Sequence, residues 1–264
     1  MNELVAQAEI LWPAMVAGLL VIATHIPLGR EVLQRGIIFL DLAIAQTAAF
    51  GVVLANTFAG SAHDGHQNLS TTGIAITAAI AGSLLLYSLR RLEIRLQESM
   101  IGILFVLMAT GTILLLSTDP HGGERLKEIL VGQILWLQAE DLLQLFIAYS
   151  LILAVWVFAR DKLGEWLFYP LFAITITLST QVVGVYLVFA SLIIPSVITL
   201  RHSNPLIKAY GIGVFGYLIG LVLSATFDLP AGASIVWCLA VTASIYYGMT
   251  LLKQTLQSST SSHS

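Results

Sequence analysis

The stretch WLFYPLFAITITLSTQVVGVYLVFASLIIPSVITL, residues 166–200, carries no charged side chain over more than thirty positions. A membrane-spanning helix needs about 17 to 25 mostly apolar residues. The stretch is therefore too long for one ordinary crossing and slightly short for two. Gly184 lies near its middle, so we expect two short helices that meet there, one of which can stop short of the far side of the membrane.

The rest of the chain has the same apolar character. Hydrophobic residues make up 57% of the 264 positions and charged residues 10%, whereas charged residues are about a quarter of a soluble domain. The sequence predicts an all-α polytopic membrane protein with one transmembrane domain, residues 1–252. The Ser/Thr-rich tail, residues 253–264, is expected to be cytoplasmic and disordered. A pI of about 6.0 and the lack of a basic stripe exclude a nucleic-acid partner.

Charged and polar breaks divide the chain into apolar segments of spanning length. We expect crossing helices at residues 10–28, 36–58, 72–89, 100–116, 142–158, 207–226 and 234–252, and two more within 166–200, which gives nine. The apolar stretch ILVGQILWL, residues 129–137, is too short to cross and predicts a re-entrant or interfacial segment.

Basic residues indicate the orientation, because loops rich in Lys and Arg stay cytoplasmic. Ten of the twelve basic residues lie in alternate connections: Arg30, Arg35, Arg90, Arg91, Arg95, Arg160, Lys162, Arg201, Lys208 and Lys253. This partition places the N-terminus outside and the C-terminus inside, in a cell membrane crossed many times.

No enzyme motif is present in the chain. It has no GxxxxGK[ST] loop for a nucleotide phosphate, no HExxH metal motif and no GxSxG elbow. We therefore expect no enzymatic activity, and any uphill transport must be driven by another subunit or by an ion gradient.

Asp41 is the only acid well inside an apolar segment, and an ionisable residue at such depth is a candidate functional residue. Gln46 follows five residues later, about 140° around an ideal helix, so the two share a face only if the helix is distorted. The alternative is that Asp41 lies near the cytoplasmic interface and only caps a helix end.

Histidines supply the other candidate metal ligands. His25 lies at the end of the first span, while His63, Asp64 and His66 occur together in SAHDGHQN, in a predicted outer connection. Imidazole and carboxylate groups are ligands that zinc and other divalent ions accept. The alternatives are a hydrogen-bonded structural histidine at position 25 and a merely solvated outer loop, and the same choice applies to His121 with Glu124.

Pro195 lies where the long apolar run meets a basic cytoplasmic connection. A proline there kinks or starts a helix, so we expect a short bent helix that presents residues 196–204 to the cytoplasm. The alternative is an ordinary kinked helix end.

Three stretches together resemble the metal-type ABC importer permeases, a family that takes up zinc, manganese and iron. They are GVYLVFASLIIPSVITL (184–200), ERLKEILVGQILWLQAEDL (124–142) and ESMIGILFVLMATGTILLLS (98–117). The similarity runs in the same order over nearly the whole chain. It implies a compact type II importer fold of many helices.

The chain departs from the family pattern in its second segment. The family usually shows Gly-Asp-x-x-x-His, with the acid and the histidine associated with the metal path. Asp41 matches the acid, but the histidine position is Ala45, and Gln46 follows it. The chain thus resembles a divergent branch, and Asp41, Gln46, His25, His63 and His66 are its candidate metal residues.

The resemblance also implies partners. These are a cytoplasmic ATP-binding subunit, an extracytoplasmic metal-binding protein and a second copy of the permease in a homodimer, all in membrane lipid. Pro195, Arg201, His202 and Asn204 are then the candidate contacts with the ATPase. We expect no permanently bound cofactor, because the divalent ion is the substrate. An ion-coupled secondary transporter with Asp41 as its coupling residue is the alternative from the residues alone.

Overall fold

The computed structural model describes residues 2–59, 69–200, 202 and 204–261. Every regular element in these ranges is a helix. The elements are α1 (Asn2–Arg35), α2 (Leu40–Ala59), α3 (Leu69–Ser88), α4 (Ile94–Leu116), α5 (Gly122–Val131), the 3-10 helix η1 (Ile134–Trp136), α6 (Ala139–Thr199), α7 (Pro205–Phe227) and α8 (Ala231–Ser261).

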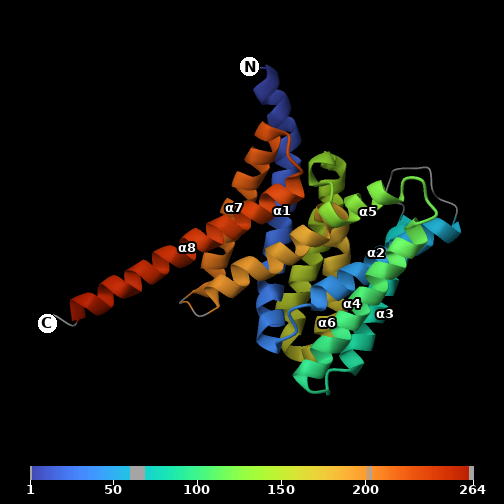
Figure 1. The fold of residues 1–264 in the computed structure, drawn as a ribbon, viewed down its shortest axis with the longest axis horizontal. Coiled ribbons are helices and arrows are strands. Elements are labelled where there is room, and N and C mark those ends of the chain that lie inside the picture. Colours follow the sequence, from blue (N-terminus) through green and yellow to red (C-terminus); the bar gives the residue numbers. More distant parts are fainter. Residues whose placement is uncertain (1, 60–68, 201, 203, 262–264) are drawn as a thin grey trace.

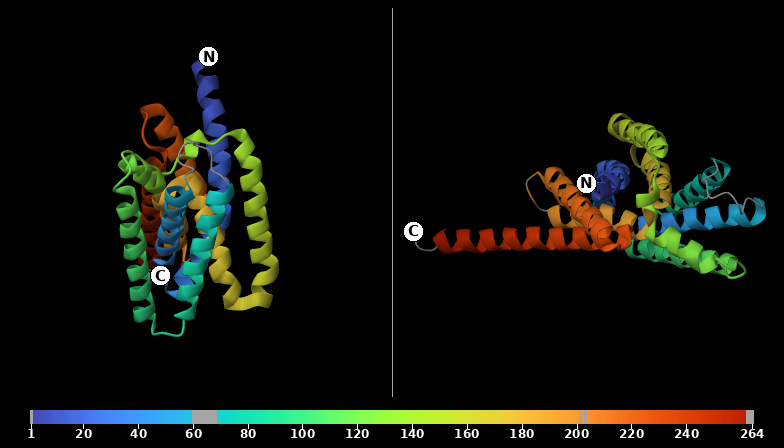
Figure 2. Two further views of the ribbon diagram at one scale, coloured as in Figure 1. Left: turned by 90° about the vertical axis from the view of Figure 1, so that its right-hand side faces the viewer. Right: turned by 90° about the horizontal axis from the view of Figure 1, so that it is seen from above.

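The expected polytopic membrane architecture is confirmed. Eight stretches of the described residues are long and apolar enough to cross a membrane, and residues 166–199 count as one of them. The helical backbone of α6 reverses direction near residues 159–165, so α6 contributes one descending and one returning segment (Figure 2). Beyond Gly184 the helix changes direction again, so residues 185–199 form a shorter segment that runs toward the start of α7 (Figure 1).

The helices form two groups joined by α6. On one side α2 packs against α3 and α4, and on the other side α7 packs against α1 and α8. The α6 helix lies between the groups and contacts members of both, as Figure 1 shows. Buried residues make up 67% of the spanning windows of α2 and of residues 166–199, against 17% for α4. The interior of the protein is therefore built around α6 and α2.

The outward faces of the bundle are apolar. Large side chains such as Phe158, Trp237 and Leu114 expose more than two thirds of their surface. A soluble monomer rarely exposes apolar surface on this scale. These faces suit contact with lipid tails.

The connections between helices lie at the two ends of the bundle, as the basic residues predict. The start of α1, residues 117–121 and residues 228–230 lie at one end, whereas residues 89–93 and the reversal at 159–165 lie at the other (Figure 2). The apolar stretch 129–137 does not cross. It is divided between the end of α5 and η1, at the same end as the start of α1.

The last helix extends into the tail. Helix α8 continues to Ser261, while the expected disorder of residues 253–264 stays a prediction. The segment KQTLQSSTS contains neither Gly nor Pro, the residues that most strongly end a helix, and so nothing in it stops the helix begun in the membrane.

Candidate functional site

Asp41 lies in the first turn of α2 and is 1% exposed. Both carboxylate oxygens are buried, and neither accepts a hydrogen bond from a described residue. The N–H groups of Asp41 and Leu42 lie near the carboxylate, in the positive field at the helix N-terminus, but without hydrogen-bond geometry. Asp41 therefore does not form a hydrogen-bonded helix cap. Its carboxylate is a buried acceptor without a hydrogen-bond partner among the described residues.

The residues that follow Asp41 on α2 are also buried. Gln46 is 5% exposed and Thr47 is 6% exposed. The Thr47 hydroxyl donates to the Ala43 carbonyl at 2.7 Å, and Thr47 packs against Gly82 of α3. Ala45, at the position where the resembled family has histidine, is 1% exposed and can supply no ligand.

His25 is fully buried within α1. Its Nδ1 lies 2.9 Å from the Val21 carbonyl oxygen, and so Nδ1 carries the proton and donates. The Thr24 hydroxyl also donates to this carbonyl, at 3.0 Å. The other ring nitrogen, Nε2, is buried and has no partner among the described residues. The tautomer thus leaves the Nε2 lone pair open.

Several predicted residues fall outside what the structure describes. These are His63, Asp64 and His66 of the outer loop and Arg201 of the inner connection. Within the described ranges, no three His, Cys, Asp or Glu side chains come together as a metal cluster. The described part of the chain thus offers single buried ligands.

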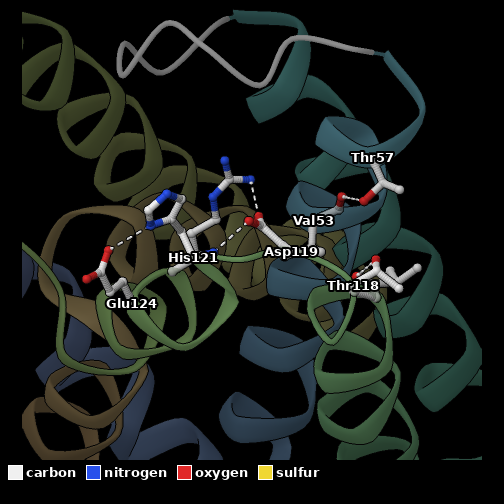
Figure 3. Close-up of polar contacts among 8 residues, drawn as sticks. Val53, Thr57, Thr118, Asp119, His121 and Glu124 are labelled. Carbon is white, nitrogen blue, oxygen red and sulfur yellow. Dashed lines mark hydrogen bonds and ion pairs between the residues drawn. The ribbon is translucent and has the colours of Figure 1, made fainter.

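The connection between the end of α4 and the start of α5 carries a small polar network (Figure 3). Asp119 accepts the backbone N–H of His121 at 2.9 Å and pairs with the Arg125 guanidinium at 3.0 Å. Nδ1 of His121 lies 3.4 Å from Glu124 Oε2, and both side chains are largely exposed. Asp119 is thereby occupied by its neighbours, which leaves His121 and Glu124 as a pair on the surface.

The inner connection begins where α6 ends. The helix runs through Pro195 to Thr199, whose hydroxyl donates to the Pro195 carbonyl at 2.8 Å. The His202 ring is half-buried and packs on Tyr246 of α8, with ring centroids 5.6 Å apart. Asn204 adopts a left-handed conformation (φ 53°) directly before Pro205, the first residue of α7. This turn redirects the chain from α6 into α7.

One expectation about this connection is wrong in part. Ser196 and Thr199 are buried, whereas Val197, Leu200 and Asn204 are exposed. The Ser196 hydroxyl lies 3.4 Å from the Ile26 carbonyl of α1, and Gly29 of α1 leaves the space that Ser196 and Leu192 fill. One face of the helix end is therefore held against α1, and Val197 remains exposed on another face.

The sequence did not predict the backbone contact between Gly132 and Gly184, which holds the interrupted helix α6. Gly132, after α5, and Gly184, within α6, both have positive φ values of 76° and 79°. The Gln133 N–H also points at the Val182 carbonyl, at 3.4 Å. A third glycine, Gly232 of α8, lies against the carbonyl of Val131. The signal in the sequence was the single glycine in ILVGQILWL, which interrupts an apolar stretch.

Comparison with known proteins places this architecture in a family. The model of the ABC 3 transport family matches residues 7–168 and 161–249, nearly the whole chain. The similarity extends to curated relatives. The chain is 29% identical over 164 residues to the "Probable iron transport system membrane protein" of Haemophilus influenzae, an alignment that covers 53% of this chain and 60% of the relative. It is 26% identical over 232 residues to the "Manganese transport system membrane protein MntC" of Halalkalibacterium halodurans, covering 79% of this chain and 76% of the relative.

A solved structure has the same fold. The complex described as "PsaBC from Streptococcus pneumoniae in complex with Fab" contains a chain that superposes with a TM-score of 0.71. The match covers 89% of this chain and 90% of that chain, at 21% identity. The expectations of a multi-pass membrane transport subunit, rather than an enzyme, and of the family resemblance are confirmed. The chain therefore belongs to the ABC 3 transport family, as a permease component of the metal-type ABC transporters.

Proposed function

We propose that the chain is the membrane subunit of an importer that moves a divalent metal ion, zinc, manganese or iron, into the cytoplasm. The observation that carries this proposal is the Asp41 carboxylate, which is buried in the protein interior without a hydrogen-bond partner. An uncompensated carboxylate in a membrane segment is costly and is expected where function requires it. A divalent cation is the partner that its charge and two oxygens suit.

The names of two relatives support a metal substrate. One is described as an iron transport membrane protein and the other as a manganese transport membrane protein. Both ions accept carboxylate and amide oxygens. Asp41 is therefore proposed as a ligand during transit, with Gln46 as the residue that supplies an amide oxygen if α2 is distorted between them. His63 and His66 are proposed to capture the ion at the outer face.

The energy is proposed to come from a separate ATP-binding subunit, because the sequence has no nucleotide-binding loop of its own. We place a cytoplasmic ATP-binding subunit at the inner connection, where Pro195 ends the apolar run and Arg201, His202 and Asn204 follow. An extracytoplasmic metal-binding protein would dock at the opposite end, and a second copy of the permease would complete the complex. The ion is the substrate, and no permanently bound cofactor is proposed.

Isotope uptake by proteoliposomes that contain the complete complex tests this function. With ATP inside the vesicles and the metal-binding protein outside, we expect accumulation of one of ⁶⁵Zn, ⁵⁴Mn or ⁵⁵Fe, and none without ATP. Accumulation driven by a proton or sodium gradient without ATP would favour the ion-coupled alternative. No accumulation of any of the three ions would overturn the proposal.

A further inference from the structure

Among the described residues, the Nε2 atom of His25 is buried without a hydrogen-bond partner, as are the Asp41 oxygens and the ring nitrogens of His202. His25 lies on the face of α1 that packs against α6 and α7. Positions 18, 22, 25 and 29 share this face, because residues three and four apart line one side of a helix. Gly18 lies against the Tyr217 ring of α7, and Gly29 lies against the Leu192 backbone of α6. His25 is therefore enclosed where α1, α6 and α7 meet.

The hydroxyl groups near this junction donate elsewhere. Ser191 donates to the Leu187 carbonyl at 2.6 Å, so the Tyr217 hydroxyl, 2.8 Å from Ser191, donates to Ser191. The Tyr210 hydroxyl donates to the Ala23 carbonyl of α1 at 3.1 Å. The His25 ring nitrogen is the acceptor that these donors leave unsatisfied. A buried polar atom left without a partner destabilises a fold and calls for an explanation.

We propose that His25 Nε2 is a ligand for the transported ion at a point distinct from Asp41, a proposal that rests on the function proposed above. The ring is arranged as metal-binding histidines are, because its other nitrogen donates to a backbone carbonyl, which fixes the tautomer and the ring orientation. An arriving cation would satisfy the Nε2 lone pair of His25, which the packing leaves without a donor.

The two acceptors lie at different depths. His25 precedes the end of α1 at Arg35 by ten residues, which is about 15 Å along a helix. Asp41 lies in the first turn of α2, just after the connection that follows Arg35. Both helices pack against α6. An ion that contacts both residues would thus meet the imidazole nearer the middle of the membrane and the carboxylate near its inner end.

An imidazole ligand at this position determines which class of metal ion the route favours. Imidazole nitrogen suits zinc and the first-row transition ions, whereas calcium and magnesium prefer oxygen ligands alone. A route that includes His25 therefore favours a transition-metal ion over calcium or magnesium, which a carboxylate by itself does not.

A matched pair of substitutions separates a ligand from a structural histidine. In His25→Asn the amide can replace the Nδ1–H donor but leaves nothing at the Nε2 position. In His25→Gln the amide oxygen can reach the Nε2 position but the Nδ1 donor is lost. We expect uptake of the transported isotope by the complete complex to fall at least about tenfold in His25→Asn and to fall less in His25→Gln. Equal uptake by His25→Asn and the unaltered complex, or a larger loss in His25→Gln, would overturn the inference.

A direct measurement covers the case in which both variants fold poorly. Mn²⁺ is added to the full-length permease in lipid nanodiscs, with His63, His66 and His121 replaced by Ala, and pulsed electron paramagnetic resonance measures nitrogen coupling to the ion. We expect coupling to imidazole nitrogen that disappears in His25→Gln. Its absence before that substitution, in a complex that still takes up the isotope, would overturn the inference and leave the proposed function standing.

Discussion

Gly132 and Gly184 meet backbone to backbone, although one follows α5 and the other interrupts α6. A Cβ atom on Gly184 would overlap the Gly132 nitrogen, and a Cβ atom on Gly132 would overlap the Gly184 nitrogen. Both residues also have positive φ, a conformation that side-chain-bearing residues rarely adopt. This contact holds the non-crossing α5–η1 segment against the break in the long helix.

Replacing Gly184 by Ala should destabilise the permease. The left-handed backbone alone costs about 1–2 kcal/mol for a residue with a Cβ atom, and the new methyl group would overlap the Gly132 backbone. We expect a clear fall in the apparent melting temperature of the detergent-solubilised protein, measured by fluorescence size-exclusion chromatography after heating. Gly102→Ala is the control, because that position lies in α4 with open space around it. Equal melting temperatures for the two variants would contradict the finding.

Replacing Asp41 by Asn should remove transport without unfolding the protein. No hydrogen bond to the carboxylate is lost in the described structure, and an unpaired buried charge is itself unfavourable. We expect isotope uptake to fall at least about tenfold, with an unchanged or higher melting temperature.

Asp141→Asn serves as the matched control for Asp41. Asp141 accepts the N–H of Gln138 at 3.1 Å in the capping box that begins α6, and it is exposed. Its replacement should lower stability by about 0.5–2 kcal/mol and leave uptake intact. Normal uptake in Asp41→Asn would instead favour a role confined to the helix end.

The orientation in the membrane can be measured with single cysteines in a Cys238→Ala background. Glu93 directly precedes α4 and His121 follows its other end, and the basic residues place position 93 inside. We expect an impermeant thiol reagent to label His121→Cys in intact cells and to label Glu93→Cys only after lysis. Labelling of Glu93→Cys in intact cells would reverse the proposed orientation.

Charge reversal at Arg201 tests the proposed contact with the ATPase. Complementary charges steer and orient association between proteins, so Arg201→Glu should reduce the amount of ATP-binding subunit that copurifies and lower coupled uptake. The melting temperature of the permease alone should not change. Undiminished copurification of the ATP-binding subunit, together with unchanged uptake, would show that Arg201 only belongs to the connection between α6 and α7 and does not bind the ATPase.

The sequence alone determined the membrane architecture, because the length of an apolar segment and the placement of charges are local properties that the bilayer reads directly. Residues 166–200 predicted a long apolar segment interrupted at Gly184, and residues 129–137 predicted a segment too short to cross the membrane. Asp41 was identifiable as unusual from its apolar neighbours. The disorder expected from the polar composition of residues 253–264 stays a prediction, and α8 continues to Ser261 because no Gly or Pro in that segment stops the helix.

Only the tertiary structure decided what the candidate residues touch. Gly132 lies opposite Gly184, and His25 lies in the junction of α1, α6 and α7, because packing brings together segments far apart in the chain. The same packing buries Ser196 against Ile26, where the sequence suggested a surface helix. Whether a polar atom is satisfied depends on neighbours from other helices. The open acceptors of Asp41 and His25 could therefore be found only once those helices were in place.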